Sequence, residues 1–176
     1  MDAVNDAENE AVTAAEHDAA GPDPRWLVGV ERDAWLSLIG VIIRLPAALD
    51  TQLQRDAGLS HFEYTVMVNL SNTEGHVLRM SALAGLCHSS LSRLSHVVAR
   101  LERRGWLRRD PCPDDGRATL ATLTPDGFAK LASAAPGHVE AVRDYVIDAL
   151  DDEQLGRLHR IGDVILRRLD GDTARR

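Results

Sequence analysis

Side chains suited to binding a nucleic acid lie between Ser89 and Arg117. The first half of this stretch has apolar residues at helical spacing, which predicts an amphipathic helix; they are Leu91, Leu94, Val98 and Leu101. The opposite face carries hydroxyls, arginines and a histidine, at Ser89, Ser92, Arg93, His96, Arg100 and Arg103. Because the major groove of DNA admits a helix and displays hydrogen-bonding base edges, such a face suits a duplex.

The second half of the stretch predicts a hairpin. Gly105 is placed to end the helix, and the β-prone runs 106–110 and 118–123 flank Asp115-Gly116, a strong signal for a hairpin turn. A thin ribbon can lay an arginine in the minor groove. Between residues 88 and 109 the sequence holds six arginines and one acid, Glu102, although the net charge of the whole chain is −7. On periodicity and charge alone, the alternative is a solvated helix face beside an ordinary hairpin.

Composition bounds the class of protein. The chain has 176 residues and only 4% aromatic residues, so we expect a core of aliphatic side chains in packed helices. Residues 1–24 hold seven acids and no lysine or arginine, which leaves residues 25–176 with 20 acidic and 20 basic residues. The acidic N-terminus is unlike a signal peptide. The longest apolar run, 34–43, is too short to span a bilayer. We expect a cytoplasmic protein without a membrane partner.

The chain is expected to be mainly α with a small β-hairpin wing, in a winged helix-turn-helix arrangement. Residues 1–24 predict a disordered acidic tail. Residues 25–58 and 124–170 predict long helices with apolar stripes, which suggests a dimerisation lobe built from both ends of the chain. Residues 59–123 predict the DNA-binding lobe. Pro46 predicts a kink in the first helix, near residues 42–45.

Start signals place the other helices. Ser60 and Glu63 fit a capping box, and Ser81 is expected to cap a short helix over residues 82–87. Thr124-Pro125 fits an N-cap followed by proline in the first turn. Asp151 and Gln154 fit the cap of a last helix. Pro136-Gly137 is expected to bend the helix between these two starts.

Five motifs in this order and spacing resemble the MarR family (multiple antibiotic resistance regulators). They are Met80-Ser81-Ala82-Leu83-Ala84, Ser92-Arg93-Leu94, Leu101-Glu102-Arg103-Arg104-Gly105-Trp106-Leu107, Asp115-Gly116-Arg117 and Leu123-Thr124-Pro125-Asp126-Gly127. The resemblance covers residues 34–169. It implies a triangular homodimer with interleaved terminal helices, acting as a transcriptional regulator, usually a repressor of its own or a neighbouring gene.

The resemblance also implies roles for particular residues. The recognition helix is Ser89–Arg100, Arg117 is the wing-tip arginine that enters the minor groove, and Asp115 matches the acid that orients it. This sequence has Gly116 at the position where many relatives carry a second arginine. Ser89 has two equally weighted roles: it contacts DNA, or it serves only as the helix N-cap. The candidate DNA-binding residues are Ser89, Ser90, Ser92, Arg93, His96, Arg100, Arg108, Asp115 and Arg117.

Members of the family usually sense a small molecule, an oxidant or a metal. The resemblance places the effector pocket where the first, second and fifth helices meet the DNA-binding lobe, with Trp35, Arg44, His61, Tyr64 and Met67 as wall candidates. An ordinary core or interface role is the alternative for each of these.

Other sensors and other functions have less support in the sequence. Cys87 and Cys112 form no CxxC pair and no histidine pair has metal-ligand spacing, so no metal site or cofactor is predicted. A metal- or thiol-responsive regulator and a protein-docking winged helix stay open as alternatives. The sequence shows no nucleophile–base pair of the kind that an enzyme would need, so an enzyme is not predicted.

Overall fold

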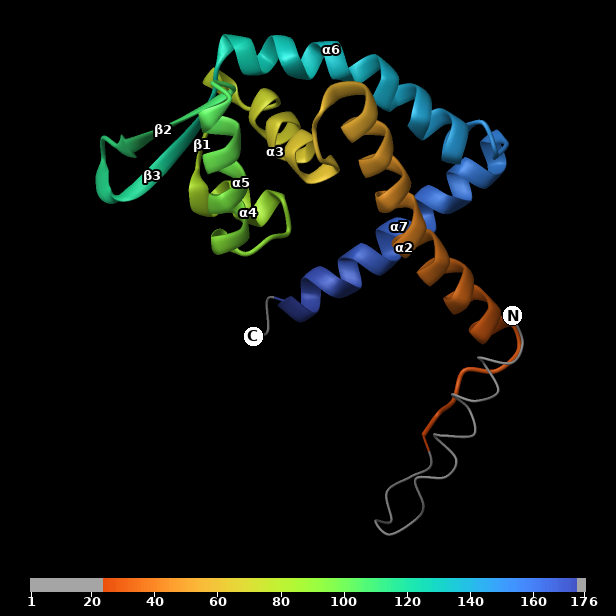
Figure 1. Ribbon diagram of the computed structural model, residues 1–176. Coiled ribbons are helices and arrows are strands. Elements are labelled where there is room, and N and C mark those ends of the chain that lie inside the picture. Colours follow the sequence, from red (N-terminus) through yellow and green to blue (C-terminus); the bar gives the residue numbers. More distant parts are fainter. Residues whose placement is uncertain (1–23, 174–176) are drawn as a thin grey trace, which may run out of the picture. The chain divides into compact units, whose positions relative to one another are not determined.

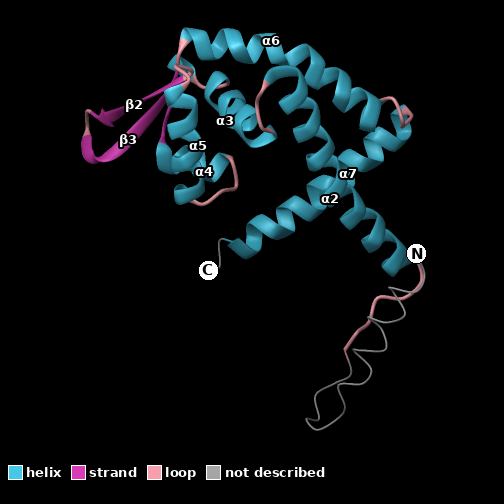
Figure 2. Cartoon of the chain, viewed as in Figure 1, coloured by secondary structure: helices cyan, strands magenta, loops and turns pink. Residues whose placement is uncertain are grey.

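The computed structural model describes residues 24–173, which are mostly helical with one small antiparallel sheet (Figures 1 and 2). The predicted tail of residues 1–24 lies almost wholly outside the described residues. The helices, including one 3₁₀ turn (η1) and one π-helical turn (η2), are α2 (Val30–Ala57), α3 (His61–Ser71), η1 (Glu74–His76), α4 (Met80–Leu86), α5 (Leu91–Arg103), α6 (Pro125–Val142), η2 (Arg143–Ile147) and α7 (Asp152–Thr173). The strands are β1 (Val77–Arg79), β2 (Leu107–Cys112) and β3 (Asp115–Leu123).

The described chain divides into two compact units, one up to Ile39 and one from Gly40 onward. The boundary falls inside α2, a continuous helix of 28 residues that contains Pro46. The kink expected at this proline stays a prediction, as does the division into dimerisation and DNA-binding lobes. Within residues 24–173, α2 is also the one helix long and apolar enough to cross a membrane, with a mean hydropathy of 1.4 over 18 residues.

Most of the predicted helix starts are confirmed. Ser60 and Glu63 form the capping box of α3, Thr124 caps α6 with Pro125 in its first turn, and Asp151 and Gln154 exchange backbone-to-side-chain hydrogen bonds at the start of α7. The expected cap at Ser81 is wrong. Helix α4 begins at Met80 because the N-cap conformation falls on Arg79, the last residue of β1.

The sheet has the order β1-β3-β2, and β2 and β3 form the ribbon that projects from the helices in Figure 1. The turn predicted at Asp115-Gly116 is wrong, because Cys112 pairs with Asp115 and the turn falls on Pro113 and Asp114. Proline at the second position of a turn has its φ already fixed, so Pro113 sets the turn in preference to Gly116, three residues later. The predicted hairpin itself is confirmed.

The core of the second unit is aliphatic and lies where α3, α4 and α5 meet the sheet. Its fully buried side chains are Leu53, Leu59, Val66, Met67, Leu70, Leu83, Leu94, Val98 and Leu101. Burying each of these contributes roughly 1.5–3 kcal/mol relative to exposure. Helix α5 is therefore fixed through its apolar face, and its polar face is left toward solvent.

Helix α6 is fixed to the base of the wing by a glycine. A Cβ built on Gly127 would lie 2.1 Å from the carbonyl oxygen of Trp106 and 2.8 Å from Leu123 Cδ1, so only glycine fits. Thr124 Oγ1 also donates to the carbonyl of Gly105 at 2.7 Å. These contacts lock the start of α6 onto the segment that joins α5 to the wing, and they fix the direction of the ribbon.

Candidate nucleic-acid interface

Helix α5 carries the exposed polar face that the sequence predicted. Ser92, Arg93 and His96 are all exposed, and Leu94, Val97, Val98 and Leu101 are buried beneath them. Leu91 was expected to belong to the apolar stripe but is 51% exposed, because it stands in the first turn, beyond the edge of the core. The face is continuous over two turns and is long enough to meet several base pairs.

The N-terminus of α5 is set by Ser90, whose Oγ accepts a hydrogen bond from the backbone N–H of Arg93 at 3.2 Å. Ser89 was expected to be either a DNA contact or the N-cap, with equal weight, and it is not the cap. It precedes the helix, and its hydroxyl lies 3.4 Å from the carbonyl oxygen of Ser90. Gly105, with φ +75°, ends the helix at its other end as predicted.

Arg93 is pre-oriented by an aromatic ring. Its guanidinium lies 4.4 Å from the centre of the Phe62 ring on α3, a cation–π contact that leaves the N–H groups available for acceptors. A groove of about 590 Å³ runs along this side of α5, and Ser92, Arg93 and His96 are among the residues that line it. An arginine held in this way can form a bidentate pair with guanine.

Arg100 also lies on α5, but the structure ties it to the protein. Its Nε donates to Glu63 Oε1 at 3.1 Å, and the Glu63 side chain is only 7% exposed. The other carboxylate oxygen accepts from the backbone N–H of Ser60 at 2.8 Å. Burial alone would raise the pKa of Glu63, but the hydrogen bonds from Ser60 and Arg100 outweigh it and lower the pKa. Arg100 therefore links α5 to the start of α3.

The arginines of the strands differ in what they contact. Arg108 pairs with Asp110 on its own strand at 2.7 Å, and Arg109 pairs with Glu102 at the end of α5 at 2.6 Å. The pairing with Arg109 lowers the pKa of Glu102. Within residues 24–173, the Arg117 side chain has no hydrogen-bond or ion-pair partner. Of these three arginines, Arg117 is the one most available to a ligand.

Asp115, which directly follows the turn at the tip of the wing, makes two polar contacts. Its Oδ1 accepts from the backbone N–H of Arg117 at 3.1 Å, and its Oδ2 lies 3.9 Å from Arg79 Nη1. The resemblance to relatives implied that Asp115 orients the side chain of Arg117. In this structure it orders the backbone before that side chain, and it draws Arg79 toward the wing.

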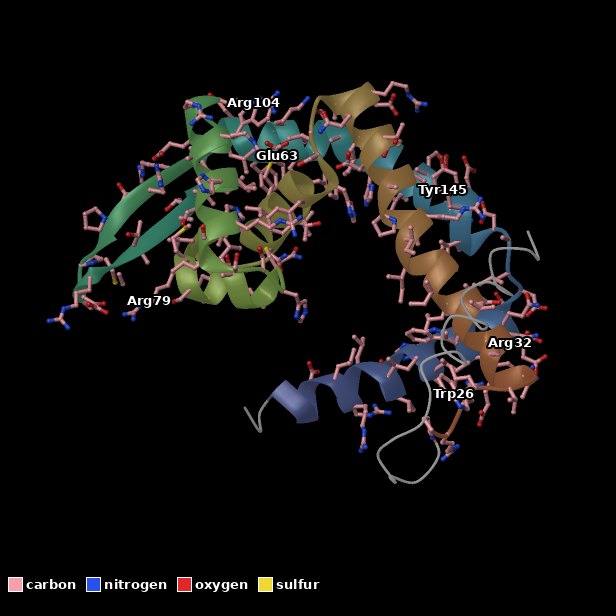
Figure 3. All side chains as sticks on the ribbon, turned by 60° about the horizontal axis from the view of Figure 1, so that its bottom comes forward. Trp26, Arg32, Glu63, Arg79, Arg104 and Tyr145 are labelled. Atoms are coloured by element: carbon pink, nitrogen blue, oxygen red, sulfur yellow. The ribbon has the colours of Figure 1, made fainter. Side chains whose placement is uncertain are left out.

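A cleft of about 340 Å³ lies between the wing and helices α4 and α5. Its polar lining comes from Arg79, Ser81, Ser95, Arg109, Asp115, Arg117 and Thr119. Figure 3 shows Arg79 between the wing and α4. Arg79 was not among the binding residues predicted from the sequence. The one feature that could have pointed to Arg79 is its place at the end of a three-residue strand, directly before the helix-turn-helix. That place indicates a contact with the wing only once the pairing of β1 with β3 is known.

The candidate effector residues have mixed surroundings. Tyr64 and Met67 are buried in the core, and the ring of His61 lies 5.8 Å from that of His138. Trp35 and Arg44 are exposed residues of α2, one in each compact unit. The effector pocket stays a prediction. In the part of the chain that the structure describes, no group of three or more His, Cys, Asp or Glu side chains is placed to hold a metal ion.

The cysteines differ in exposure. Cys87 is half-buried and burial raises the pKa of its thiol, partly offset by a contact with Asn69. Cys112 is buried in the wing. A thiol with a raised pKa forms less of the reactive thiolate, which gives the thiol-responsive alternative no support from Cys87.

Known proteins resemble this chain over most of its length. The model of the MarR family matches residues 59–119. The chain is 28% identical over 133 residues to the HTH-type transcriptional regulator PecS of Dickeya dadantii (strain 3937), covering 70% of this chain and 80% of PecS. It is 33% identical over 96 residues to the transcriptional regulator HosA of Escherichia coli O111:H-, covering 54% of this chain and 63% of HosA.

Solved structures extend the similarity to the fold. Sco3205, a MarR family transcriptional regulator from Streptomyces coelicolor in complex with DNA, is 45% identical with a TM-score of 0.80, covering 83% of this chain and 92% of Sco3205. AbsC, a MarR family transcriptional regulator from the same organism, is 38% identical with a TM-score of 0.79, covering 84% of this chain and 99% of AbsC.

Proposed function

Because this chain belongs to the MarR family and is a DNA-binding transcriptional regulator, we propose that it acts as a cytoplasmic homodimer that binds a pseudo-palindromic operator and represses its own or a neighbouring gene. The observation that carries the proposal is the pairing of two features on one lobe. Helix α5 presents Ser92, Arg93 and His96 to solvent, and the wing presents Arg117 without a partner among the described residues.

In this arrangement the two elements have different tasks. Arg93 and His96 lie about one turn apart on α5, so both can reach base edges in a major groove and read sequence. Arg117 enters the adjacent minor groove, where its contribution depends more on groove width and charge than on base identity. At the start of α5, Ser89, Ser90 and Ser92 serve as phosphate or base contacts, and Arg108 on β2 serves as a phosphate contact.

The dimer is supported by apolar surface that one copy leaves exposed. Helix α7 exposes Leu158, Ile161 and Ile165 on one stripe, and α2 exposes apolar side chains between Val30 and Ile43, Trp35 and Ile42 among them. A second copy is the occupant we favour over a bilayer, because both helices carry such stripes and relatives of this family are DNA-binding regulators.

Two variants test the DNA-binding assignment. Arg93→Ala should lower the ratio of operator to scrambled-DNA affinity, because one base-reading contact is worth about 1–3 kcal/mol. Arg117→Ala should weaken binding to both DNAs and flatten the salt dependence. Arg157→Ala, which removes an exposed arginine of α7 paired with Glu153, is the matched control. Wild-type affinity and specificity in both test variants would contradict the assignment.

The dimer and the effector need separate measurements. Ile161→Asp places a charge on the exposed stripe of α7 and should give monomers in sedimentation equilibrium, with loss of operator binding. Equal dimer strength in this variant would contradict an interface at Ile161. For the effector, release of labelled operator by lipophilic aromatic compounds should be weakened by Arg44→Ala, which changes a predicted wall residue of the pocket.

A further inference from the structure

The cleft between the wing and the helix-turn-helix has the chemistry of an anion site. Three arginines from three strands line it, Arg79 from β1, Arg109 from β2 and Arg117 from β3. The hydroxyls of Ser81 on α4 and Ser95 on α5 add neutral donors, and Asp115 is the one acid in the lining. Guanidinium and hydroxyl groups are the side-chain donors that bind phosphate oxygens in protein–DNA complexes.

The arginines of this cleft are not equally available. Arg109 is held by Glu102 through two hydrogen bonds, at 2.6 and 2.9 Å. Among the described residues, the one polar contact of the Arg79 side chain is with Asp115 at 3.9 Å, which is longer than a hydrogen bond, and the side chain is 50% exposed. Its N–H donors are therefore available to a ligand.

The position of the cleft identifies the anion. A protein that places a helix in one major groove and its wing in the adjacent minor groove must straddle the phosphate strand that separates the two grooves. The cleft lies between those two elements, since Leu91 and Ser95 of α5 line one side and Arg117 to Thr119 of the wing line the other. The strand between the grooves has to cross this cleft.

We infer that this cleft binds a backbone phosphate of the DNA strand between the two grooves, and that Arg79 is the residue that contacts it. The inference rests on the proposed placement of α5 and the wing in adjacent grooves. Asp115 keeps Arg79 beside the wing when DNA is absent, and Ser81 and Ser95 supply further donors. Arg79 thus fixes the register of the protein on the duplex without reading its sequence.

Salt dependence is the direct test, because removing one phosphate contact reduces the slope of log K against log [salt] by about 0.9. A dimer presents the cleft twice, so Arg79→Gln should reduce the slope by about 1.8. Between 50 and 200 mM KCl the wild type should then lose about 12-fold more affinity than the variant. The ratio of operator to scrambled-DNA affinity should stay the same. Arg79→Lys should keep the slope, and Arg157→Gln is the control.

A second measurement locates the contact on the DNA. Neutral methylphosphonates are placed one at a time along the operator, and the position between the two grooves should weaken the wild type but not Arg79→Gln. An unchanged slope in a folded Arg79→Gln, or equal sensitivity of both proteins to every methylphosphonate, would overturn the inference. If the wild type showed no preference for any duplex selected from a random pool, the proposed function itself would fail.

Discussion

Replacing Arg100 by methionine tests whether this residue of α5 binds DNA or stabilises the fold through Glu63. The sequence placed Arg100 among DNA-binding residues, whereas the structure shows its Nε 3.1 Å from the buried carboxylate of Glu63. Arg100→Met keeps most of the aliphatic length and removes the charge. Glu63 would then keep hydrogen bonds from Ser60 but would lose its ionic partner.

The size of the effect follows from the burial of the two partners. Breaking a fully buried ion pair costs about 3–5 kcal/mol. The Arg100 side chain is 49% exposed, so water reaches its end of the pair and the expected loss falls to about 1–2 kcal/mol. In a chain of this length, that loss lowers the melting temperature by roughly 2–8 °C.

Acid pH should reduce the difference between the two proteins. The folded-state pKa of Glu63 lies below its ordinary value, so the pair stabilises the protein above the unfolded-state pKa. That contribution is lost as the pH falls through the lowered pKa of the folded state. The destabilisation by Arg100→Met is therefore largest near neutral pH and shrinks in acid.

The assay is thermal unfolding by circular dichroism, run beside DNA titrations of the same samples. Glu63→Gln combined with Arg100→Met should recover stability, because no buried charge remains without a partner and glutamine still fits the capping box. The salt slope of DNA binding should be unchanged in Arg100→Met. A slope reduced by about 1.8 with no change in melting temperature would refute the structural role and make Arg100 a phosphate contact.

Other variants test local features of the fold. Ser90→Ala should lower the unfolding free energy by about 1 kcal/mol through loss of the α5 cap, and Ser89→Ala should leave it unchanged; equal effects in urea unfolding would contradict the assignment of the cap. Gly127→Ala should destabilise by about 1–3 kcal/mol or more, because the added Cβ meets the Trp106 carbonyl at 2.1 Å. Gly85→Ala on α4, with nothing within 4 Å, should instead stabilise by up to about 1 kcal/mol, and a mild effect at Gly127 would show that α6 is not locked to the wing base.

The features that could be predicted from the sequence are those set by neighbours along the chain. The stripe of α5, its end at Gly105 and the cap at Thr124 depend on residues within about one turn. The structure confirms them, except that Leu91 of the predicted stripe is exposed. The wing turn was misplaced because two turn signals overlap within four residues. Pro113 fixes its own φ, so the ribbon extends to Cys112 and Asp115.

Features that depend on contacts between residues far apart in the chain could not be predicted from the sequence. Arg100 and Glu63 are 37 positions apart, so periodicity placed Arg100 on a polar face and could not show its partner. The contact between Arg79 and Asp115 likewise requires β1 to pair with β3. The N-cap role considered for Ser89 falls to Ser90 instead, because the helix begins one residue later, and two neighbouring serines do not fix its start.

The central claim is that two copies of this chain recognise a particular DNA sequence through α5 and the wing. Fluorescence anisotropy would compare DNA from upstream of the gene that encodes the chain with scrambled DNA, at several salt concentrations. We predict saturation at two chains per duplex, affinity for the upstream DNA at least about 10³-fold tighter than for scrambled DNA, and a steep linear fall of log K with log [salt]. Equal, weak binding to both DNAs at every salt concentration would contradict the claim.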